Sequence, residues 1–339
     1  SAAFGIVSGA VGVVLVVLTR SVVWFAAGFL GGQVAALIWL LVRAPADVRR
    51  GAPPRAGDLL RLARATLPFA VAFVALTVHY KVDILLLERL RTTGEVGLYA
   101  AAYKFIDVFH ALVLVAVGAM YPRLSRAAVR KRGDDGRWAA TRAAELLLLG
   151  AVPVGAGLWL LREPMVALLF GDGYVGAVPV LALLAPVLPA LAVNLCGGYV
   201  LGAERRMGSV AVLYGAGVSL KIALALWAIP RWGAVGAAGA VLASETCVAF
   251  VMVAVLGRLA GAAPGKRSVA LAGGAAGLAA ITAWWMSPLG APATALTYLV
   301  AAAVLYRLSG ALSHEERSAV LEALVPARGH GAAAVGGLP

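Results

Sequence analysis

Residues 97–120 read GLYAAAYKFIDVFHALVLVAVGAM, and residues 121–142 read YPRLSRAAVRKRGDDGRWAATR. The first segment is long and apolar enough to cross a bilayer as a helix, which takes about 20 mostly apolar residues. The second segment is polar and rich in arginine. The same alternation predicts ten transmembrane helices, at 3–19, 22–42, 65–87, 97–120, 143–161, 177–202, 210–229, 234–257, 269–286 and 293–307.

The composition supports this interpretation. Hydrophobic residues make up 62% of the 339 residues, and the mean hydropathy of +0.92 is too high for a soluble chain with one core. The fold class that we expect is therefore all-α, a polytopic membrane helix bundle.

The basic residues predict the orientation of the chain. Of the 29 lysines and arginines, 21 lie in the breaks after the second, fourth, sixth, eighth and tenth predicted helices, and only five lie in the opposite breaks. Lysine and arginine are enriched in cytoplasmic loops. We therefore expect a multi-pass membrane protein whose even-numbered breaks and C-terminus are cytoplasmic.

Other classes of protein fit the sequence poorly. The net charge of +13 lies in loops that flank the membrane, and no basic stripe interleaved with aromatic residues indicates a nucleic-acid partner. Cys196 and Cys247 both lie inside predicted helices, with neither a disulfide framework nor a zinc pattern. No cofactor or metal is expected. Because the chain starts at Ser1 and runs straight into an apolar segment, we expect it to be the interior and end of a longer protein.

The polar breaks suggest how the chain is organised. Residues 43–64 contain three prolines and two glycines, a composition typical of a connector. Residues 58–64, DLLRLAR, predict a separate short amphipathic helix on the membrane surface. The segment 163–175 is too short to span a membrane and predicts a surface helix closed by a turn at 171–173.

Ionisable residues inside the predicted membrane helices are the candidate functional residues. Each charge at the bilayer centre costs about 2.5–3.5 kcal/mol on insertion scales, so these side chains should face the protein interior or a wet cavity. They are His79, Lys81, Asp83, Lys104, Asp107, His110, Lys221 and Glu245.

Helical spacing predicts which of these side chains share a face. Lys104, Asp107 and His110 follow one another at intervals of three residues, and His79 and Asp83 are one turn apart. A short loop joins the predicted helices 65–87 and 97–120. We therefore expect their two polar faces to meet around a hydrated pocket, with Lys81 pointing elsewhere.

A purely structural alternative remains open for these residues. Lys104–Asp107 could be an ion pair within one helix, and Lys221–Glu245 could pair across a hairpin. A metal site at the histidines lacks a third ligand at suitable spacing. Three lysines face three carboxylates, so charge alone does not establish an anion site.

Several motifs resemble the Wzx-like oligosaccharide flippases of the superfamily of multidrug, oligosaccharidyl-lipid and polysaccharide exporters, which includes the MATE transporters. These are Asp83 inside a helix, EVGLY at 95–99, AAYK at 101–104, YPRLS at 121–125, LLFG at 168–171 and GAERR at 202–206. The resemblance covers roughly 60–257 well and the flanks loosely.

The resemblance implies a fold of two six-helix lobes, sometimes followed by two extra helices. On that template 1–42 closes the N-terminal lobe, 43–64 is a cytoplasmic linker, 65–257 is the C-terminal lobe, and 258–339 holds the extra helices and a tail. The substrate-binding or coupling residues are then Lys81, Asp83, Lys104, Asp107 and Lys221, which His110 and Glu245 join by their position.

The function that the resemblance implies is transport, and the protein is expected not to be an enzyme. Such proteins move undecaprenyl-pyrophosphate-linked glycans across the inner membrane by alternating access. The expected partners are that glycan lipid, membrane lipids, a coupling ion (H⁺ or Na⁺) and the glycan polymerase or glycosyltransferases of the pathway. The alternatives are a lipid II flippase, a drug/cation antiporter in which Asp83, Asp107 or Glu245 titrates, a membrane glycosyltransferase and a structural scaffold.

Overall fold

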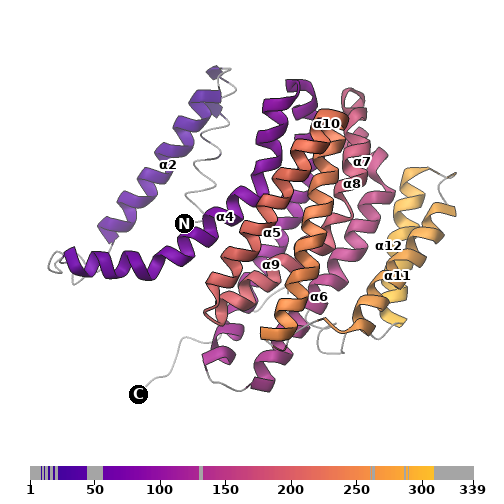
Figure 1. Cartoon of the computed structure of the whole chain (residues 1–339). Coiled ribbons are helices and arrows are strands. Elements are labelled where there is room, and N and C mark those ends of the chain that lie inside the picture. Colours follow the sequence, from indigo (N-terminus) through magenta and orange to yellow (C-terminus); the bar gives the residue numbers. More distant parts are fainter. Residues whose placement is uncertain are drawn as a thin grey trace, which may run out of the picture. The chain divides into compact units, whose positions relative to one another are not determined.

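The structure is a computed structural model, and every regular element in its described residues is a helix (Figure 1). It describes residues 22–43, 56–129, 133–259, 264–285 and 290–308, together with a few single positions. The predicted helix 3–19 therefore lies mostly outside the described residues. The long apolar helices confirm the predicted class, an all-α polytopic membrane helix bundle.

The chain divides into two units, Ser1–Ala65 and Thr66–Pro339. In the first unit, α2 (Val22–Arg43) matches the predicted helix 22–42. Large apolar side chains are exposed along α2, among them Leu30, Val34 and Trp39. A helix that is apolar on all sides belongs in lipid or in a large core. The assignment of the two units to family lobes stays a prediction.

Helix α4 (Ala56–Leu90) corrects one expectation. Residues 58–64 do not form a separate helix but are the first turns of α4. The segment DLLRLAR contains neither glycine nor proline, so nothing in it interrupts the backbone hydrogen bonds of the helix. The next break is also shorter than expected, because α5 (Thr93–Val129) and α6 (Gly133–Leu160) extend into 121–142.

The second unit continues with shorter elements. They are α7 (Arg162–Phe170), the 3₁₀ helix η1 (Asp172–Ala177), α8 (Val178–Leu184) and α9 (Val187–Ala203). Helix α7 ends at Gly171, whose φ of 79° is in the left-handed region, and this agrees with the expected short helix and turn. The segment from η1 to α8 meets α9 at an angle of 54°.

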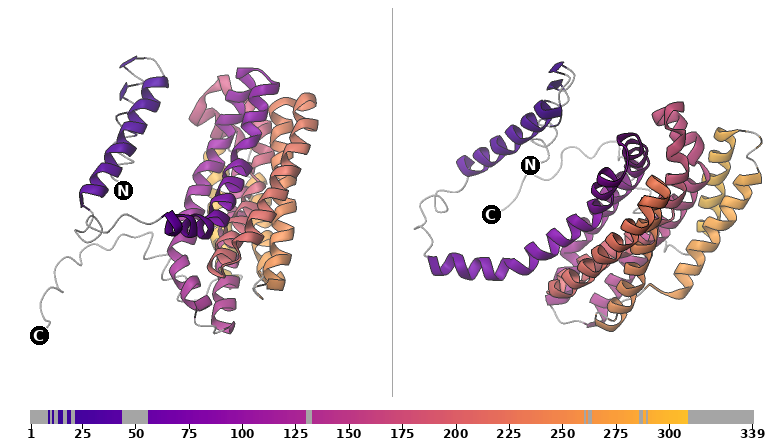
Figure 2. Two further views of the ribbon diagram at one scale, coloured as in Figure 1. Left: turned by 60° about the vertical axis from the view of Figure 1, so that its left-hand side comes forward. Right: turned by 45° about the horizontal axis from the view of Figure 1, so that its top comes forward.

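Three helices complete the unit: α10 (Met207–Leu259), α11 (Lys266–Trp285) and α12 (Ala291–Leu308). Helix α9 contacts α5, α6 and α10, and α11 contacts both α6 and α12. The right-hand view in Figure 2 shows α11 and α12, in orange and yellow, as a neighbouring pair.

Helix α10 is a hairpin that holds two of the predicted membrane helices, 210–229 and 234–257. Its backbone departs from helical geometry at Gly233, where φ is 55°. The side chains of Lys221 and Glu245 are 3.0 Å apart, whereas a straight helix would separate residues 24 positions apart by about 36 Å. The close approach of the two arms also needs Gly236, since a Cβ there would lie 2.4 Å from the carbonyl oxygen of Ala228.

A pair of charged residues holds the tip of this hairpin. Arg91 donates hydrogen bonds to the carbonyl oxygens of Ile229 (3.0 Å) and Pro230 (2.9 Å), at the end of the first arm. Glu95 accepts one from the backbone N–H of Ala234 (3.1 Å), at the start of the second arm. Each charge thus meets the helix end of opposite polarity. The glutamate of the EVGLY motif therefore has a capping role in this fold.

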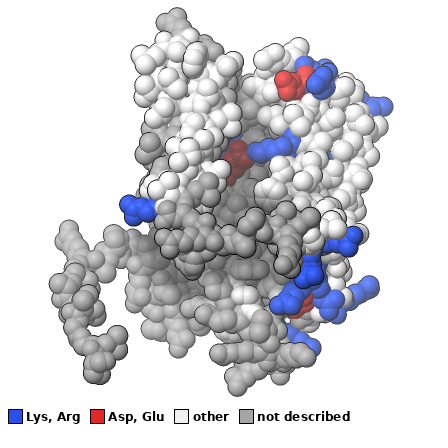
Figure 3. Space-filling view, turned by 90° about the vertical axis from the view of Figure 1, so that its left-hand side faces the viewer, with Lys and Arg blue, Asp and Glu red and all other residues white. Residues whose placement is uncertain are grey.

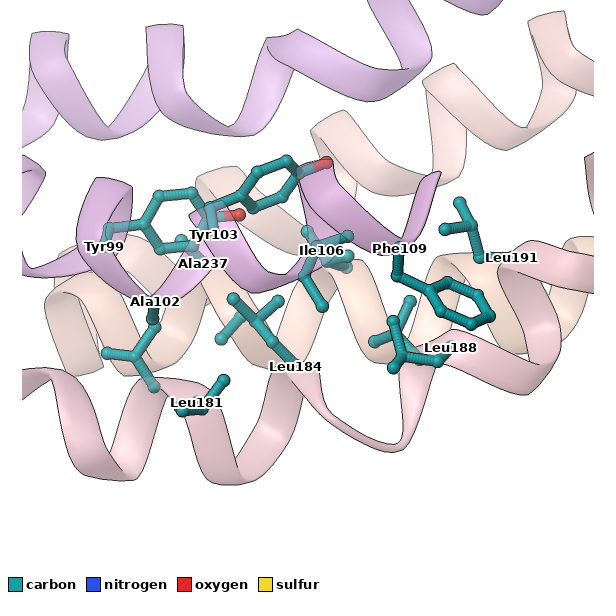
Figure 4. Packing of buried hydrophobic residues seen from close by; sticks show 14 of the residues in the cluster. Tyr99, Ala102, Tyr103, Ile106, Phe109, Leu181, Leu184, Leu188, Leu191 and Ala237 are labelled. Carbon is teal, nitrogen blue, oxygen red and sulfur yellow. The ribbon is translucent and has the colours of Figure 1, made fainter. Parts of the chain in front are cut away.

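The main core lies between α5, α8, α9 and α10. Figure 4 shows one face of α5 against the leucines of α8 and α9, with the hydroxyl groups of Tyr99 and Tyr103 pointing away from those leucines. The buried residues of α5 recur every three or four positions, which is the period of one helix face. This face contains Tyr99, Ala102, Ile106, Phe109, Val113 and Val117, and the neighbouring Ala101 and Tyr103 are also buried. This packing fixes the rotation of α5 and so decides where its charged residues point.

The distribution of surface residues agrees with a membrane location. Three described helices are long and apolar enough to cross a membrane (Thr93–Tyr121, Ala140–Leu160 and Met207–Leu259), and the bent segment Asp172–Leu184 with Val187–Ala203 would be a fourth. In Figure 3 the charged side chains of the described residues lie in separate groups, with uncharged surface between them.

Most exposed tryptophans of the second unit lie at one end of it, whereas Trp138, which is also exposed, lies near the start of α6 at the opposite end. Those at the first end lie near the end of α6, at the tip of the α10 hairpin and at the end of α11, and they are Trp159, Trp227, Trp232, Trp284 and Trp285. Tryptophan is enriched at the interface between membrane and water. The alternating direction of the helices places all five at the same end as the α10 tip.

Candidate functional site

A buried polar network joins α4 to both arms of α10. The ammonium group of Lys221 donates to Oε1 of Glu245 at 3.0 Å and to the backbone carbonyl oxygen of His79 at 2.6 Å. The Nε2 atom of His79 lies 2.7 Å from the same carboxylate oxygen. The side chains of all three residues are at most 1% exposed. An ion pair buried this deeply needs such additional polar contacts to offset the loss of hydration.

Helix α9 closes this network from the other side. The side-chain amide of Asn194 donates to Oε2 of Glu245 at 2.8 Å, and the hydroxyl of Tyr214 donates to the backbone carbonyl oxygen of Asn194 at 2.9 Å. A Cβ at Gly217 would lie 3.1 Å from the imidazole of His79, so this glycine gives the ring its space. The network therefore connects three helices around one carboxylate.

A second buried carboxylate, that of Asp83, lies one helical turn from His79. It is 1% exposed, and its Oδ2 atom accepts a hydrogen bond from the hydroxyl of Tyr99. Its other oxygen, Oδ1, has no hydrogen-bond partner in the described part of the chain. Next to Asp83 is a cavity of about 130 Å³, whose wall also contains Tyr80 and Tyr103.

An exposed charged cluster lies at the edge of the same cavity. The ammonium group of Lys81 is 3.2 Å from Asp107 and 5.2 Å from the ring centroid of Tyr103. Lys104 is 3.9 Å from the other oxygen of Asp107. The exposed fractions of the side chains are 53% for Lys81, 69% for Lys104 and 38% for Asp107. Two ammonium groups thus share one carboxylate, which leaves this cluster with an excess positive charge.

His110 lies at a different place, beside a larger cavity. Its ring is 4.6 Å from that of Tyr80, and both line a cavity of about 640 Å³ between α4, α5, α9 and α10. Lys81 contributes to this cavity as well as to the smaller one. Its wall is mostly apolar and aromatic, with Tyr121 and Tyr199 among the residues that form it. The cavity could accept an amphipathic molecule with an anionic group near Lys81.

The structure confirms one part of the expected meeting of two polar faces, since Asp83, Lys104 and Asp107 line one cavity, and it corrects another part. His79 and Asp83 share the buried face of α4, but the residue of α4 that meets the cluster on α5 is Lys81. Among the described residues, the hydrogen bond from Tyr99 is the only one between α5 and Asp83. The reason is the rotation of α5, which turns Ile106 and Phe109 into the core and leaves Lys104 exposed and Asp107 at the edge of the packed face.

Sequence reasoning placed the charged residues but missed several of their partners. Both proposed ion pairs, Lys221–Glu245 and Lys104–Asp107, are present. The roles of Tyr99 and Tyr214 were not predicted. Their position inside predicted membrane helices could have indicated them, because the hydroxyl of a buried tyrosine needs a hydrogen-bond partner. The role of Asn194 was not predicted either.

Comparison with known proteins identifies the fold and the family. The chain resembles the solved structure of lipid II flippase MurJ in an inward closed conformation, with a TM-score of 0.74 and 12% identity over 94% of this chain and 67% of that chain. A MATE multidrug resistance transporter in an outward-facing conformation gives a TM-score of 0.49 at 17% identity, over 73% of this chain and 64% of that one. The protein is thus an integral membrane helix bundle with the fold seen in MurJ.

The family follows from the sequence itself. The model of the polysaccharide biosynthesis protein family matches residues 2–179, more than half of the chain. This chain belongs to that family. The succinoglycan biosynthesis transport protein ExoT of Rhizobium meliloti (strain 1021) is 30% identical over 129 residues, which are 38% of this chain and 26% of that protein. The match thus spans about a quarter of this curated relative.

Proposed function

We propose that the protein is a flippase that moves a polyprenyl-pyrophosphate-linked oligosaccharide across the bacterial inner membrane for the synthesis of cell-surface polysaccharide. Its family and its fold support transport rather than catalysis. The observation that carries the proposal is the exposed cluster of Lys81, Lys104 and Asp107. These charges lie in the interior of apolar helices, where retaining them is costly and usually marks a substrate or ion pathway.

The cluster suits a pyrophosphate group. Its two ammonium groups have one carboxylate between them. One ammonium group can therefore bind an incoming anion while the other stays paired with Asp107. Lysine binds phosphate as a compact point charge with three donors. The adjoining cavity of about 640 Å³ offers aromatic and apolar walls for the part of the ligand next to the phosphate.

The buried network has a different role in this proposal. Lys221, Glu245 and His79 hold α4 against both arms of α10, so that the helices of the second unit move together during alternating access. The exposed cluster then meets the substrate, while the network keeps the supporting helices in register. Of the predicted site residues, we assign Lys81, Lys104, Asp107 and His110 to the substrate side.

The location and partners belong to the same proposal. The even-numbered breaks and the C-terminus would be cytoplasmic, and the tryptophans at the α10 tip would mark the outer interface. The natural partners would be the glycan lipid, membrane lipids, a coupling ion and the polymerase or glycosyltransferases that make and use the glycan.

Cysteines placed in 121–142, after replacement of Cys196 and Cys247, should be protected from an impermeant thiol reagent in intact cells.

The test of substrate binding uses the full-length protein in cells that depend on it for glycan export. The variant Lys81→Met/Lys104→Met should lose export at near-normal membrane abundance, whereas Lys81→Arg/Lys104→Arg should retain much of it. Arg231→Met is the matched control, because it removes an exposed positive charge from the α10 tip. Normal export by the double methionine variant would contradict the proposed anion site. Loss of peptidoglycan synthesis instead of glycan export would indicate lipid II as the substrate.

A further inference from the structure

The two buried carboxylates of the second unit differ in how their charge is balanced. Glu245 contacts the Lys221 ammonium group, the His79 imidazole and the Asn194 amide. Asp83 has one hydrogen bond, from the neutral hydroxyl of Tyr99. The ammonium group of Lys221 has its donors on Glu245 and on the His79 carbonyl. The only buried ammonium group in the described residues is thus already paired with Glu245.

An ionised Asp83 would therefore place in the interior a negative charge that no ammonium or guanidinium group of the described residues contacts. Burying an ion without a partner costs several kcal/mol, and the usual consequence is that the group becomes neutral. Protonation gives Asp83 the neutral form and also supplies a donor at Oδ1, the oxygen that has no partner in the described residues. The hydroxyl of Tyr99 can still donate to the other oxygen.

The cavity of about 130 Å³ connects this carboxyl group with the exposed cluster. Its wall includes Asp83 at the buried end and Lys81, Lys104 and Asp107 at the exposed end. Two ammonium groups and one carboxylate give that entrance an excess positive charge, which opposes the entry of metal cations. A proton does not have to pass this entrance as a free cation, because it can be transferred from one water molecule or polar group to the next.

We propose that Asp83 is a proton-binding site and that binding and release of this proton couple the flippase to the proton gradient. The proposal deepens the proposed function and rests on it for the coupling role. The chemical step is the transfer of one proton from water to a carboxylate oxygen of Asp83, and its return to water from the carboxylic acid. Glu245 stays ionised because it is paired with Lys221. Asp83 is therefore the carboxyl group whose charge changes.

Other charged and titratable groups surround Asp83 on each helix that contributes to the site. On α4, α5 and α10 they are His79, Tyr80, Lys81, Tyr99, Tyr103, Lys104, Asp107, Lys221 and Glu245. No group of three or more His, Cys, Asp and Glu residues suited to a metal ion occurs in the described residues. A proton suits Asp83 because the carboxyl oxygen Oδ1 has no partner in the described residues and becomes a donor when protonated.

Infrared difference spectroscopy of the purified full-length protein in lipid tests the proton site directly. At neutral pH the wild type should show the carbonyl band of a protonated carboxylic acid, and Asp83→Asn should remove it. Asp107→Asn is the matched control, since it makes the same change in an exposed carboxylate lining the same cavity, and it should leave the band in place. An unchanged band in Asp83→Asn would overturn the proposal.

Thermal unfolding gives a second, independent measurement. Asp83→Asn replaces a neutral acid with a neutral amide and should leave the melting temperature near that of the wild type. Glu245→Gln strands the Lys221 ammonium group and should lower it clearly. A sodium-dependent rise in melting temperature that Asp83→Asn abolishes would show a sodium site and overturn the proposal.

The coupling role is tested through export, and its failure can be told apart from failure of the flippase assignment. Asp83→Asn should lose proton-driven glycan export in vesicles, while Asp172→Asn, which changes an exposed carboxylate outside the site, keeps it. If Asp83→Asn exports glycan normally with an unchanged dependence on the proton gradient, the protein is a flippase but Asp83 does not couple it. The infrared result requires no glycan and stands apart from either outcome.

Discussion

The buried pair of Lys221 and Glu245 allows a quantitative prediction. Replacing Lys221 with methionine, which has a similar length, removes the donor 3.0 Å from Glu245 and leaves the carboxylate with His79 and Asn194. Removing one partner of a buried ion pair typically costs about 3–5 kcal/mol, because the other charge stays buried without compensation. Glu245→Gln should cost a similar amount, since the ammonium group keeps only neutral acceptors.

The double variant Lys221→Met/Glu245→Gln should be more stable than the sum of the single changes predicts. It contains no unpaired charge, and a glutamine can still accept the hydrogen bond from Asn194 at 2.8 Å. Residues in direct contact show coupling energies of about 0.5–3 kcal/mol in double-mutant cycles. We expect this pair at the upper end of that range, because both side chains are at most 1% exposed.

The assay is denaturant unfolding of the purified protein in mixed micelles, followed by circular dichroism and tryptophan fluorescence. The control cycle uses Lys81→Met and Asp107→Asn, which form a pair at a similar distance, 3.2 Å, but are 53% and 38% exposed. Exposed pairs contribute about 0.2–1 kcal/mol, so the control coupling should be small. Equal coupling in the two cycles, or single buried variants with wild-type stability, would refute the reasoning.

Two further changes probe the packing and the hydrogen bonding of the second unit. Gly236→Ala should separate the arms of the α10 hairpin and lower the melting temperature, because its Cβ would lie 2.4 Å from the carbonyl oxygen of Ala228; Gly239→Ala, which meets no atom within 4 Å, is the control and should behave like the wild type. Tyr99→Phe removes the hydroxyl that donates to Asp83 and should cost about 1–3 kcal/mol in unfolding measurements, as expected for a buried acceptor that loses its partner; unchanged stability would show that another group replaces the hydroxyl.

Sequence patterns were sufficient for the class of fold and for the position of most helices. Apolar segments of membrane length depend only on local composition. The predicted helix 97–120 lies within α5, and 143–161 corresponds closely to the apolar part of α6. The error at 58–64 arose because a change in polarity does not by itself end a helix. Ending one requires a break in backbone hydrogen bonding, and the sequence there contains no residue that causes it.

For the candidate site as well, the sequence determined one part and the tertiary structure determined another. The sequence alone determined that charged residues such as Lys81, Asp83 and Lys221 lie inside apolar helices, because a charge among apolar residues is visible without any structure. Which of them are buried and which exposed was decided by tertiary packing. The rotation of α5 leaves Lys104 exposed, and the hairpin at Gly233 brings Lys221 to a residue 24 positions away. Such long-range contacts depend on how helices rotate and reverse against one another, and helical periodicity within a single segment does not contain that information.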